Sequence, residues 1–188
     1  MVQRASRSTP ARSGRDAPPS GGDPEGASSA SPEETLAQAL RGLAPRLDPR
    51  ADGVDGLRRL SGGASQETWA FRLAGPDTPM ILRRAPQRRR PGGSGVGLAT
   101  EAAVIRRAAA EGVPVPPILL ELSPQNGAGD GFVMPFVEGE TLPQRILRQP
   151  DFAPARTRFA AEAGRILAGI HRLDPDGLAL PRLAPQEA

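Results

Sequence analysis

Alternating apolar and polar positions in the first half of the chain predict a series of short β-strands. Trp69, Phe71 and Leu73 alternate with polar or small residues, which is the period of a strand with one buried face. We expect a shorter strand over residues 57–60 before it, and another over residues 80–83 after a Gly-Pro-Asp turn signal. Because tight turns join all three, they should form an antiparallel meander.

Apolar residues at helical spacing predict three helices around these strands. A Ser-Pro-Glu-Glu start signal at residues 31–34 introduces the first, which we expect to end near Pro45. The second begins at Leu98 and stops at Gly112, and the third covers residues 155–172. The apolar stripes expected to be buried are Leu36, Leu40 and Leu43 in the first helix, Leu98, Ala102, Ile105 and Ala109 in the second, and Phe159, Ala163, Ile166, Leu167 and Ile170 in the third.

The remaining segments complete an α+β fold with an antiparallel sheet of about five strands. Two more short strands are expected over residues 118–122 and 132–137, separated by an Asn-Gly turn signal. Residues 84–97 form a Pro/Gly/Arg loop without periodicity. Residues 1–32 are rich in Ser, Gly, Pro and Arg, with almost nothing to bury, so we expect a disordered tail there.

Composition excludes several classes of protein. The 188 residues contain no cysteine, so the chain has neither a disulfide framework nor a thiolate metal site. No apolar run approaches the roughly 18 residues that would cross a bilayer, and the N-terminus lacks the apolar core of a secretory signal. We therefore expect a cytoplasmic protein that has no membrane partner.

The charge pattern gives little support to nucleic-acid binding. All 24 basic residues are arginine and the net charge is only +3. The densest basic cluster comprises Arg83, Arg84, Arg88, Arg89 and Arg90. No aromatic residue lies among them for stacking, so we interpret the cluster as a solvated loop and do not expect nucleic acid as a partner. An Arg-rich nucleic-acid-binding protein stays as an alternative hypothesis.

A glycine-bearing loop and two opposite charges form the candidate site. Ser61-Gly62-Gly63-Ala64-Ser65 joins the first two strands, and such a loop can present backbone N–H groups and hydroxyls to phosphate oxygens, although a Gly-Gly pair is more often a plain turn. Arg83 at the end of the third strand could steady nucleotide phosphates with Glu101 as its partner. The alternative is two unconnected surface charges, with Glu101 favoured by its place in a helix first turn.

In this order the segments resemble the small lobe of the aminoglycoside phosphotransferase family, and in particular the branch that includes kinase-like domains associated with acyl-CoA dehydrogenases. The resemblance spans about residues 55–175. The matching segments are LSGGASQETW at 60–69 (the nucleotide loop), ILRR at 81–84 (the third strand), Thr100-Glu101 (the helix start), GVPVP at 112–116 (the connection after that helix) and FVMPFVEG at 132–139 (the strand linking the lobes).

The resemblance implies a protein-kinase-like nucleotide-binding lobe over residues 33–137, then a linker and the first helices of a large lobe over 138–188. It implies ATP and Mg²⁺ as cofactors and the hydroxyl of a small molecule as phosphoryl acceptor. Arg83 stands where the family carries a lysine, and Met134 and Phe136 would lie against the adenine. The residues implied to bind the nucleotide are Ser61, Gly62, Gly63, Ala64, Ser65, Arg83, Glu101, Met134 and Phe136.

The family's catalytic signature, His-Gly-Asp followed by an Asn and a metal-binding Asp, does not occur in the sequence. The lone His171 lacks the spacing of a kinase catalytic loop, and the family has such a histidine in a structural place at the end of a large-lobe helix. We expect the chain to stop before the catalytic loop, to carry no catalytic or metal-binding residue, and to leave apolar helix surface exposed. A non-catalytic nucleotide-binding or regulatory module is the second hypothesis.

Overall fold

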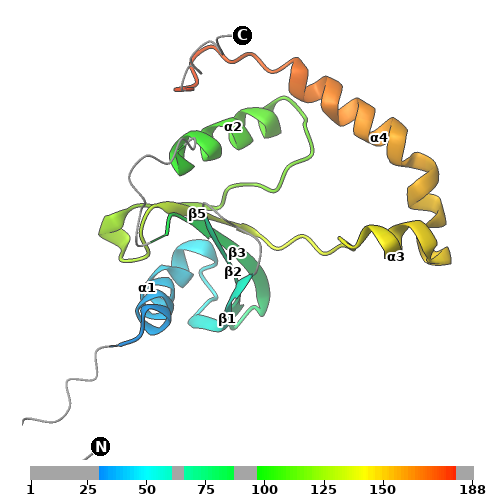
Figure 1. Cartoon of the computed structure of the whole chain (residues 1–188). Coiled ribbons are helices and arrows are strands. Elements are labelled where there is room, and N and C mark those ends of the chain that lie inside the picture. Colours follow the sequence, from blue (N-terminus) through cyan, green and yellow to red (C-terminus); the bar gives the residue numbers. More distant parts are fainter. Residues whose placement is uncertain (1–29, 61–65, 87–96, 181–188) are drawn as a thin grey trace, which may run out of the picture.

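The computed structural model describes residues 30–60, 66–86 and 97–180, which form an antiparallel sheet with a helix on each face (Figure 1). The strands are β1 (Gly53–Leu60), β2 (Glu67–Ala74), β3 (Thr78–Arg84), β4 (Leu120–Leu122) and β5 (Gly131–Pro135). Their order in the sheet is β1-β2-β3-β5-β4. The predicted meander is confirmed, since β2 pairs antiparallel with both β1 and β3. The α+β fold with five antiparallel strands is therefore confirmed as well.

Helix α1 (Pro32–Leu47) covers one face of the sheet. Its start is a capping box: the Ser31 hydroxyl accepts from the Glu34 N–H at 3.1 Å, and the Ser31 N–H donates to the Glu34 carboxylate at 2.6 Å. The predicted leucine stripe is buried against the sheet. The helix continues through Pro45, two residues further than predicted. Pro45 has no N–H to donate within the helix, but the Asp48 N–H still donates to the Ala44 carbonyl at 3.1 Å and closes the last turn.

Strand β1 begins four residues earlier than predicted. Its pairing with β2 is irregular between Asp55 and Arg58, and Gly56 there has a positive φ of 61°. A bulge of this kind interrupts the two-residue alternation, so only the second half of the strand was visible in the sequence pattern. Strand β3 extends to Arg84, which the sequence pattern had assigned to the following loop.

Strands β4 and β5 are shorter than predicted, and prolines lie near the ends concerned. β4 starts at Leu120, two residues later than expected, although the Leu119 N–H already donates to the Val133 carbonyl at 2.9 Å, and β5 runs from Gly131 to Pro135, where it ends two residues earlier than expected. A proline has no N–H to donate to the sheet. Beyond β5, the Phe136 N–H still donates to the Pro79 carbonyl of β3 at 3.1 Å, so the chain leaves the sheet just after this bond.

Helix α2 (Leu98–Ala110) lies on the opposite face from α1 and forms a smaller core there. Leu98 and Ala102 are buried together with Phe132 of β5. At its end the buried residue is Ala108, not Ala109 as predicted, since positions three and four residues apart both satisfy helical spacing. The stop at Gly112 is confirmed by its positive φ of 80°.

Helices α3 (Pro143–Arg148) and α4 (Ala153–His171) extend away from the sheet (Figure 1). Neither contains a buried residue, so the predicted burial of the α4 stripe is wrong. Phe159 is 68% exposed, and Leu167 and Ile170 are exposed as well, which matches the expected exposure of apolar helix surface. No described helix is long and apolar enough to cross a bilayer.

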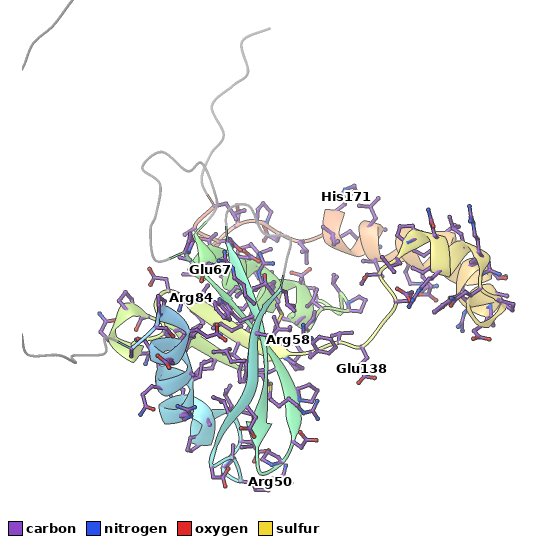
Figure 2. All side chains as sticks on the ribbon, turned by 60° about the horizontal axis from the view of Figure 1, so that its bottom comes forward. Arg50, Arg58, Glu67, Arg84, Glu138 and His171 are labelled. Atoms are coloured by element: carbon purple, nitrogen blue, oxygen red, sulfur yellow. The ribbon has the colours of Figure 1, made fainter. Side chains whose placement is uncertain are left out.

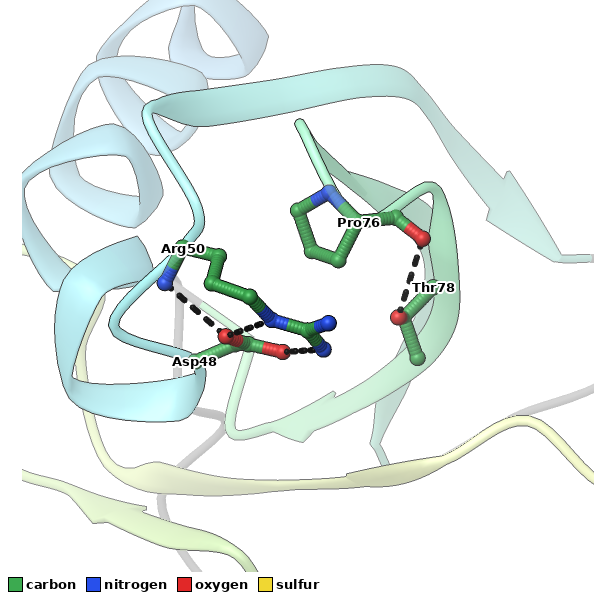
Figure 3. A network of polar contacts seen from close by, with 4 residues as sticks. All are labelled: Asp48, Arg50, Pro76 and Thr78. Carbon is green, nitrogen blue, oxygen red and sulfur yellow. Dashed lines mark hydrogen bonds and ion pairs between the residues drawn. The ribbon is translucent and has the colours of Figure 1, made fainter.

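The turn after α1 packs beside the β2–β3 turn at one end of the sheet (Figure 3). The Asp48 carboxylate accepts from the backbone N–H and the guanidinium of Arg50, at 2.8 to 3.1 Å. Hydrogen bonds from Arg50 lower the pKa of Asp48 to about 2. Gly75 lies so close that a Cβ there would meet the Arg50 carbonyl at 2.6 Å. A glycine is therefore required at this crossing.

Candidate functional site

The predicted ion pair between Arg83 and Glu101 is present. Arg83 is the penultimate residue of β3, and Glu101 lies in the first turn of α2, where its N–H donates to the Gly97 carbonyl. The Nη2 of Arg83 lies 2.9 Å from Oε1 of Glu101, and the two side chains are 32% and 28% exposed. The helix thus places a carboxylate over the strand-end cation. Whether this pair binds a nucleotide stays a prediction.

Gln66 completes this pair into a three-residue network that sequence reasoning missed. Its Oε1 accepts a hydrogen bond from Nη2 of Arg83, and its Nε2 donates to Oε2 of Glu101 at 3.2 Å. The one available signal was its position directly after the Gly-Gly loop, two residues before Thr68, which pairs with Arg83. Residues an even number apart in a strand share a face, which brings Gln66 toward the same side.

Arg83 retains donors that its partners do not use. Both Gln66 and Glu101 bind the same nitrogen, Nη2. Within the described part of the chain no group accepts from Nη1, and Nε is buried without a hydrogen-bond partner. A guanidinium has five N–H donors, so this one still has capacity for an anionic oxygen.

An apolar row lies next to Arg83 on the same face of the sheet. Ile81 precedes Arg83 by two positions and pairs with Ala70 of β2 and Met134 of β5. Ala70 and Ile81 are buried, and Met134 is half-buried against the core beneath α2. Because Ala70 and Ile81 are buried, Met134 is the member of this row that keeps apolar surface for a flat aromatic base to contact.

Phe136, the other residue predicted to contact the base, is half-buried just beyond β5. Its backbone N–H is already used, because it donates to the Pro79 carbonyl at 3.1 Å. Pro135 has no N–H to offer. Backbone donation to a ligand in this linker would therefore fall to later residues, beginning with Val137, which is 67% exposed. The predicted loop residues Ser61, Gly62, Gly63, Ala64 and Ser65 lie outside the described residues.

A second arginine network lies on the opposite face of the sheet, under α1 (Figure 2). Arg84 is only 4% exposed, and its Nε donates to Oε2 of Glu67 at 2.9 Å while its Nη1 donates to the Ala128 carbonyl at 3.2 Å. The indole of Trp69 donates to the same carboxylate at 3.1 Å, and Arg59 lies 3.5 Å from its other oxygen. The interpretation of Arg84 as part of a solvated loop is wrong, because its charge is buried and paired.

A hollow of about 410 Å³ borders this second network. It is lined by Ser31, Pro32, Glu33, Arg59, Glu67, Trp69 and Arg84. None of the four described residues predicted to bind nucleotide, Arg83, Glu101, Met134 and Phe136, is among them. The hollow belongs to the start of α1 and to the structural pair beneath it, on the face away from Arg83 and Glu101.

His171 is the last residue of α4 and is exposed (Figure 2), which confirms its predicted place at a helix end. Among the described residues, no group of three His, Cys, Asp or Glu side chains could hold a metal ion. A family model described as the phosphotransferase enzyme family matches residues 56–188, a range that contains Gln66, Arg83 and Glu101. The chain matches no curated protein and no solved structure.

Proposed function

Because this chain belongs to the phosphotransferase enzyme family, we propose that its sheet binds ATP together with Mg²⁺ on the face that carries Arg83 and Glu101. The observation that carries the proposal is the pair itself. A strand-end cation held by a helix carboxylate at 2.9 Å is the arrangement that steadies the phosphates of a nucleotide in kinase-like enzymes. In the sequence, residues 61–65, whose glycines suit phosphate binding, come directly before Gln66, which bonds both members of the pair.

Arg83 would serve where a lysine is usual, with a different geometry. Glu101 and Gln66 hold Nη2, which leaves Nη1 for a phosphate oxygen. A guanidinium remains charged at any physiological pH and its donors point in fixed directions. The phosphate is therefore approached by one defined N–H group, where a lysine would supply three rotatable donors.

The base of the nucleotide would lie on the apolar row beside Arg83. Ile81 and Arg83 are two residues apart on one strand, so a ligand that contacts both extends along β3. Met134, a register partner of Ile81, is half-buried and would provide the part of this surface that the base can reach. The spacing between Ile81 and Arg83, about 7 Å for two strand residues, is comparable to the separation of a base from its nearer phosphates.

The reaction of the family is phosphoryl transfer, and we propose a small-molecule hydroxyl as the acceptor. Bound Mg²⁺ would neutralise charge on the phosphates. The described residues provide no cluster of metal ligands, so no step of the transfer is assigned to them. Because the sequence has no His-Gly-Asp signature to orient a hydroxyl, we propose that this chain binds ATP without turnover, as a nucleotide-binding module.

Calorimetric titration of the whole chain with Mg²⁺–ATP tests the proposal. We expect saturable binding, which Arg83→Met weakens roughly 10- to 100-fold because a charge-assisted hydrogen bond is lost. Arg106→Met is the matched control: Arg106 also joins α2 to the sheet, through an exposed ion pair with Glu121 of β4. It should leave the affinity unchanged.

Three outcomes would contradict the proposal. Equal loss of affinity in both variants would mean that Arg83 acts only through general positive charge. Binding of any polyanion with steep salt dependence and no preference for a nucleotide would favour the nucleic-acid hypothesis. Transfer of the γ-phosphate to a hydroxyl by this chain alone would show that the absence of turnover is wrong.

A further inference from the structure

Gln66 is the residue that joins three elements at the candidate site. It is the first described residue after the loop of residues 61–65, and it immediately precedes β2. Its side chain bonds Arg83 of β3 and Glu101 of α2 at once. The cation and the carboxylate are therefore bridged by an amide as well as bonded directly to each other.

An amide suits this bridging place because it has both a donor and an acceptor. The Gln66 oxygen accepts from the cation and its nitrogen donates to the carboxylate, so neither charge meets a group of its own sign. A lysine or arginine at position 66 would repel Arg83, and an acidic residue would repel Glu101. The network is half-buried, where such bonds are less weakened by water than on the open surface.

The bridge also determines which nitrogen of Arg83 remains available. Gln66 and Glu101 both bind Nη2, and together they fix the rotation of the guanidinium plane. With Glu101 alone, that plane could turn about the Nη2 contact and point Nη1 elsewhere. Two acceptors on one nitrogen hold Nη1 in a defined direction, which reduces the orientational freedom lost when an anion binds.

We propose that Gln66 is a positioning residue, which fixes Arg83 for the nucleotide phosphates and links the end of the 61–65 loop to α2. The inference rests on the proposed function, since it concerns the same nucleotide. Gln66 contacts Arg83 and Glu101 and would act on the nucleotide only through them. A shift of Gln66, of β3 or of α2 would therefore change the bonds that it makes with the other two.

A double-mutant cycle on Mg²⁺–ATP affinity tests this role. Gln66→Met keeps the length of the side chain and removes both hydrogen bonds. We expect about a five- to tenfold loss of affinity in the otherwise unchanged chain, and less than a twofold loss when Arg83 is already Met. Gln38→Met is the matched control, because Gln38 makes an amide–guanidinium bond of the same kind with Arg41 on the exposed side of α1.

NMR of the Arg83 guanidinium provides a readout that does not need the nucleotide. Rotation about its Cζ–Nη bonds should be slow in the unchanged chain and clearly faster in Gln66→Met, while Gln38→Met has no effect. A purely structural role of Gln66 would lower the melting temperature and weaken binding equally with and without Arg83, and this result would overturn the inference.

The outcomes separate this inference from the proposed function. If the unchanged chain binds Mg²⁺–ATP and Gln66→Met binds it equally well, the proposed function stands and the role of Gln66 is refuted. If the unchanged chain binds no nucleotide, the proposed function fails and the positioning role fails with it. Coupled loss of affinity together with faster guanidinium rotation supports both.

Discussion

Arg83 and Arg84 are neighbours in β3, but they lie on opposite faces of the sheet in different surroundings. The side chain of Arg84 is 5% exposed, and its donors meet the Glu67 carboxylate and a backbone carbonyl. The side chain of Arg83 is 32% exposed and keeps Nη1 and Nε without partners in the described part of the chain. Arg84 is thus a buried structural cation, whereas Arg83 is a half-exposed cation that keeps unused N–H donors.

A structural charge can be distinguished from a functional one by whether its buried polar atoms have partners. A buried charge must have partners for nearly all of its polar atoms, because leaving it unpaired costs several kcal/mol of folding free energy. Arg84 meets this demand. Arg83 carries a buried Nε without a partner, which is unfavourable for stability alone. Together with Nη1, which also has no partner in the described part of the chain, it supports the proposal that Arg83 binds an anionic ligand.

The largest expected effect is loss of stability on breaking the buried pair. Arg84→Met leaves the buried Glu67 with only the more exposed and more distant Arg59 as a cation, and we expect the free energy of unfolding to fall by up to about 3–5 kcal/mol. Arg83→Met should change it by at most about 1 kcal/mol, because the Arg83–Glu101 pair is screened by water. Denaturant unfolding of the two variants measures both values.

A double variant controls for the loss of charge itself. Arg84→Met combined with Glu67→Leu removes both charges and should recover part of the stability lost in Arg84→Met. Equal destabilisation by Arg83→Met and Arg84→Met would break the comparison, since both arginines would then be structural.

A smaller loss of stability is expected from a substitution in β5, which pairs with β3 beside both arginines. A Cβ on Gly131 would meet the Arg83 carbonyl at 2.4 Å and the Arg84 Cα at 3.1 Å. Gly131→Ala should therefore push β5 away from β3 and cost about 1–3 kcal/mol of stability. Because it moves both arginines together, it should also weaken Mg²⁺–ATP binding in the same calorimetric titration.

Gly53→Ala provides the matched control for this strand substitution. Gly53 is also a buried strand glycine, but a Cβ there would meet only the Ala74 side chain, at an ordinary 3.7 Å. Its substitution should leave nucleotide affinity unchanged. A Gly131→Ala chain of unaltered stability would show that β5 is free to shift.

Sequence reasoning could predict the Arg83–Glu101 pair because local order determines it. A strand end followed by a loop and a helix start brings those two positions together in a kinase-like lobe. It could not separate Arg84 from Arg83, because Glu67 reaches Arg84 through the register of β2 with β3, which the order of the elements does not determine. Gln66 was missed for the same reason, since its two bonds join three elements.

The apolar stripe of α4 shows a different limit. Its helical spacing was read correctly, and the helix is present. Spacing identifies which side of a helix is apolar, but burial depends on whether another element covers that side. Among the described residues, the principal neighbours of α4 are α3 and the short turn Pro150–Phe152, and Phe159 stays 68% exposed.

The smallest change in stability is expected at the pair of Asp48 with Arg50, in which the arginine side chain is 78% exposed. Hydrogen bonds from Arg50 lower the pKa of Asp48 to about 2, below its value of about 3.9 in an unfolded chain. A depressed pKa means that the pair stabilises the folded chain above pH 4 and that this contribution is lost as the pH falls toward 2.

Asp48→Asn should therefore reduce the dependence of the free energy of unfolding on pH at the acid end, measured by denaturant unfolding between pH 2 and 7, without changing Mg²⁺–ATP affinity. In Arg50→Met, NMR titration should find the pKa of Asp48 back near its unfolded value, and a pKa that stayed near 2 would mean that another group holds the carboxylate in its charged form.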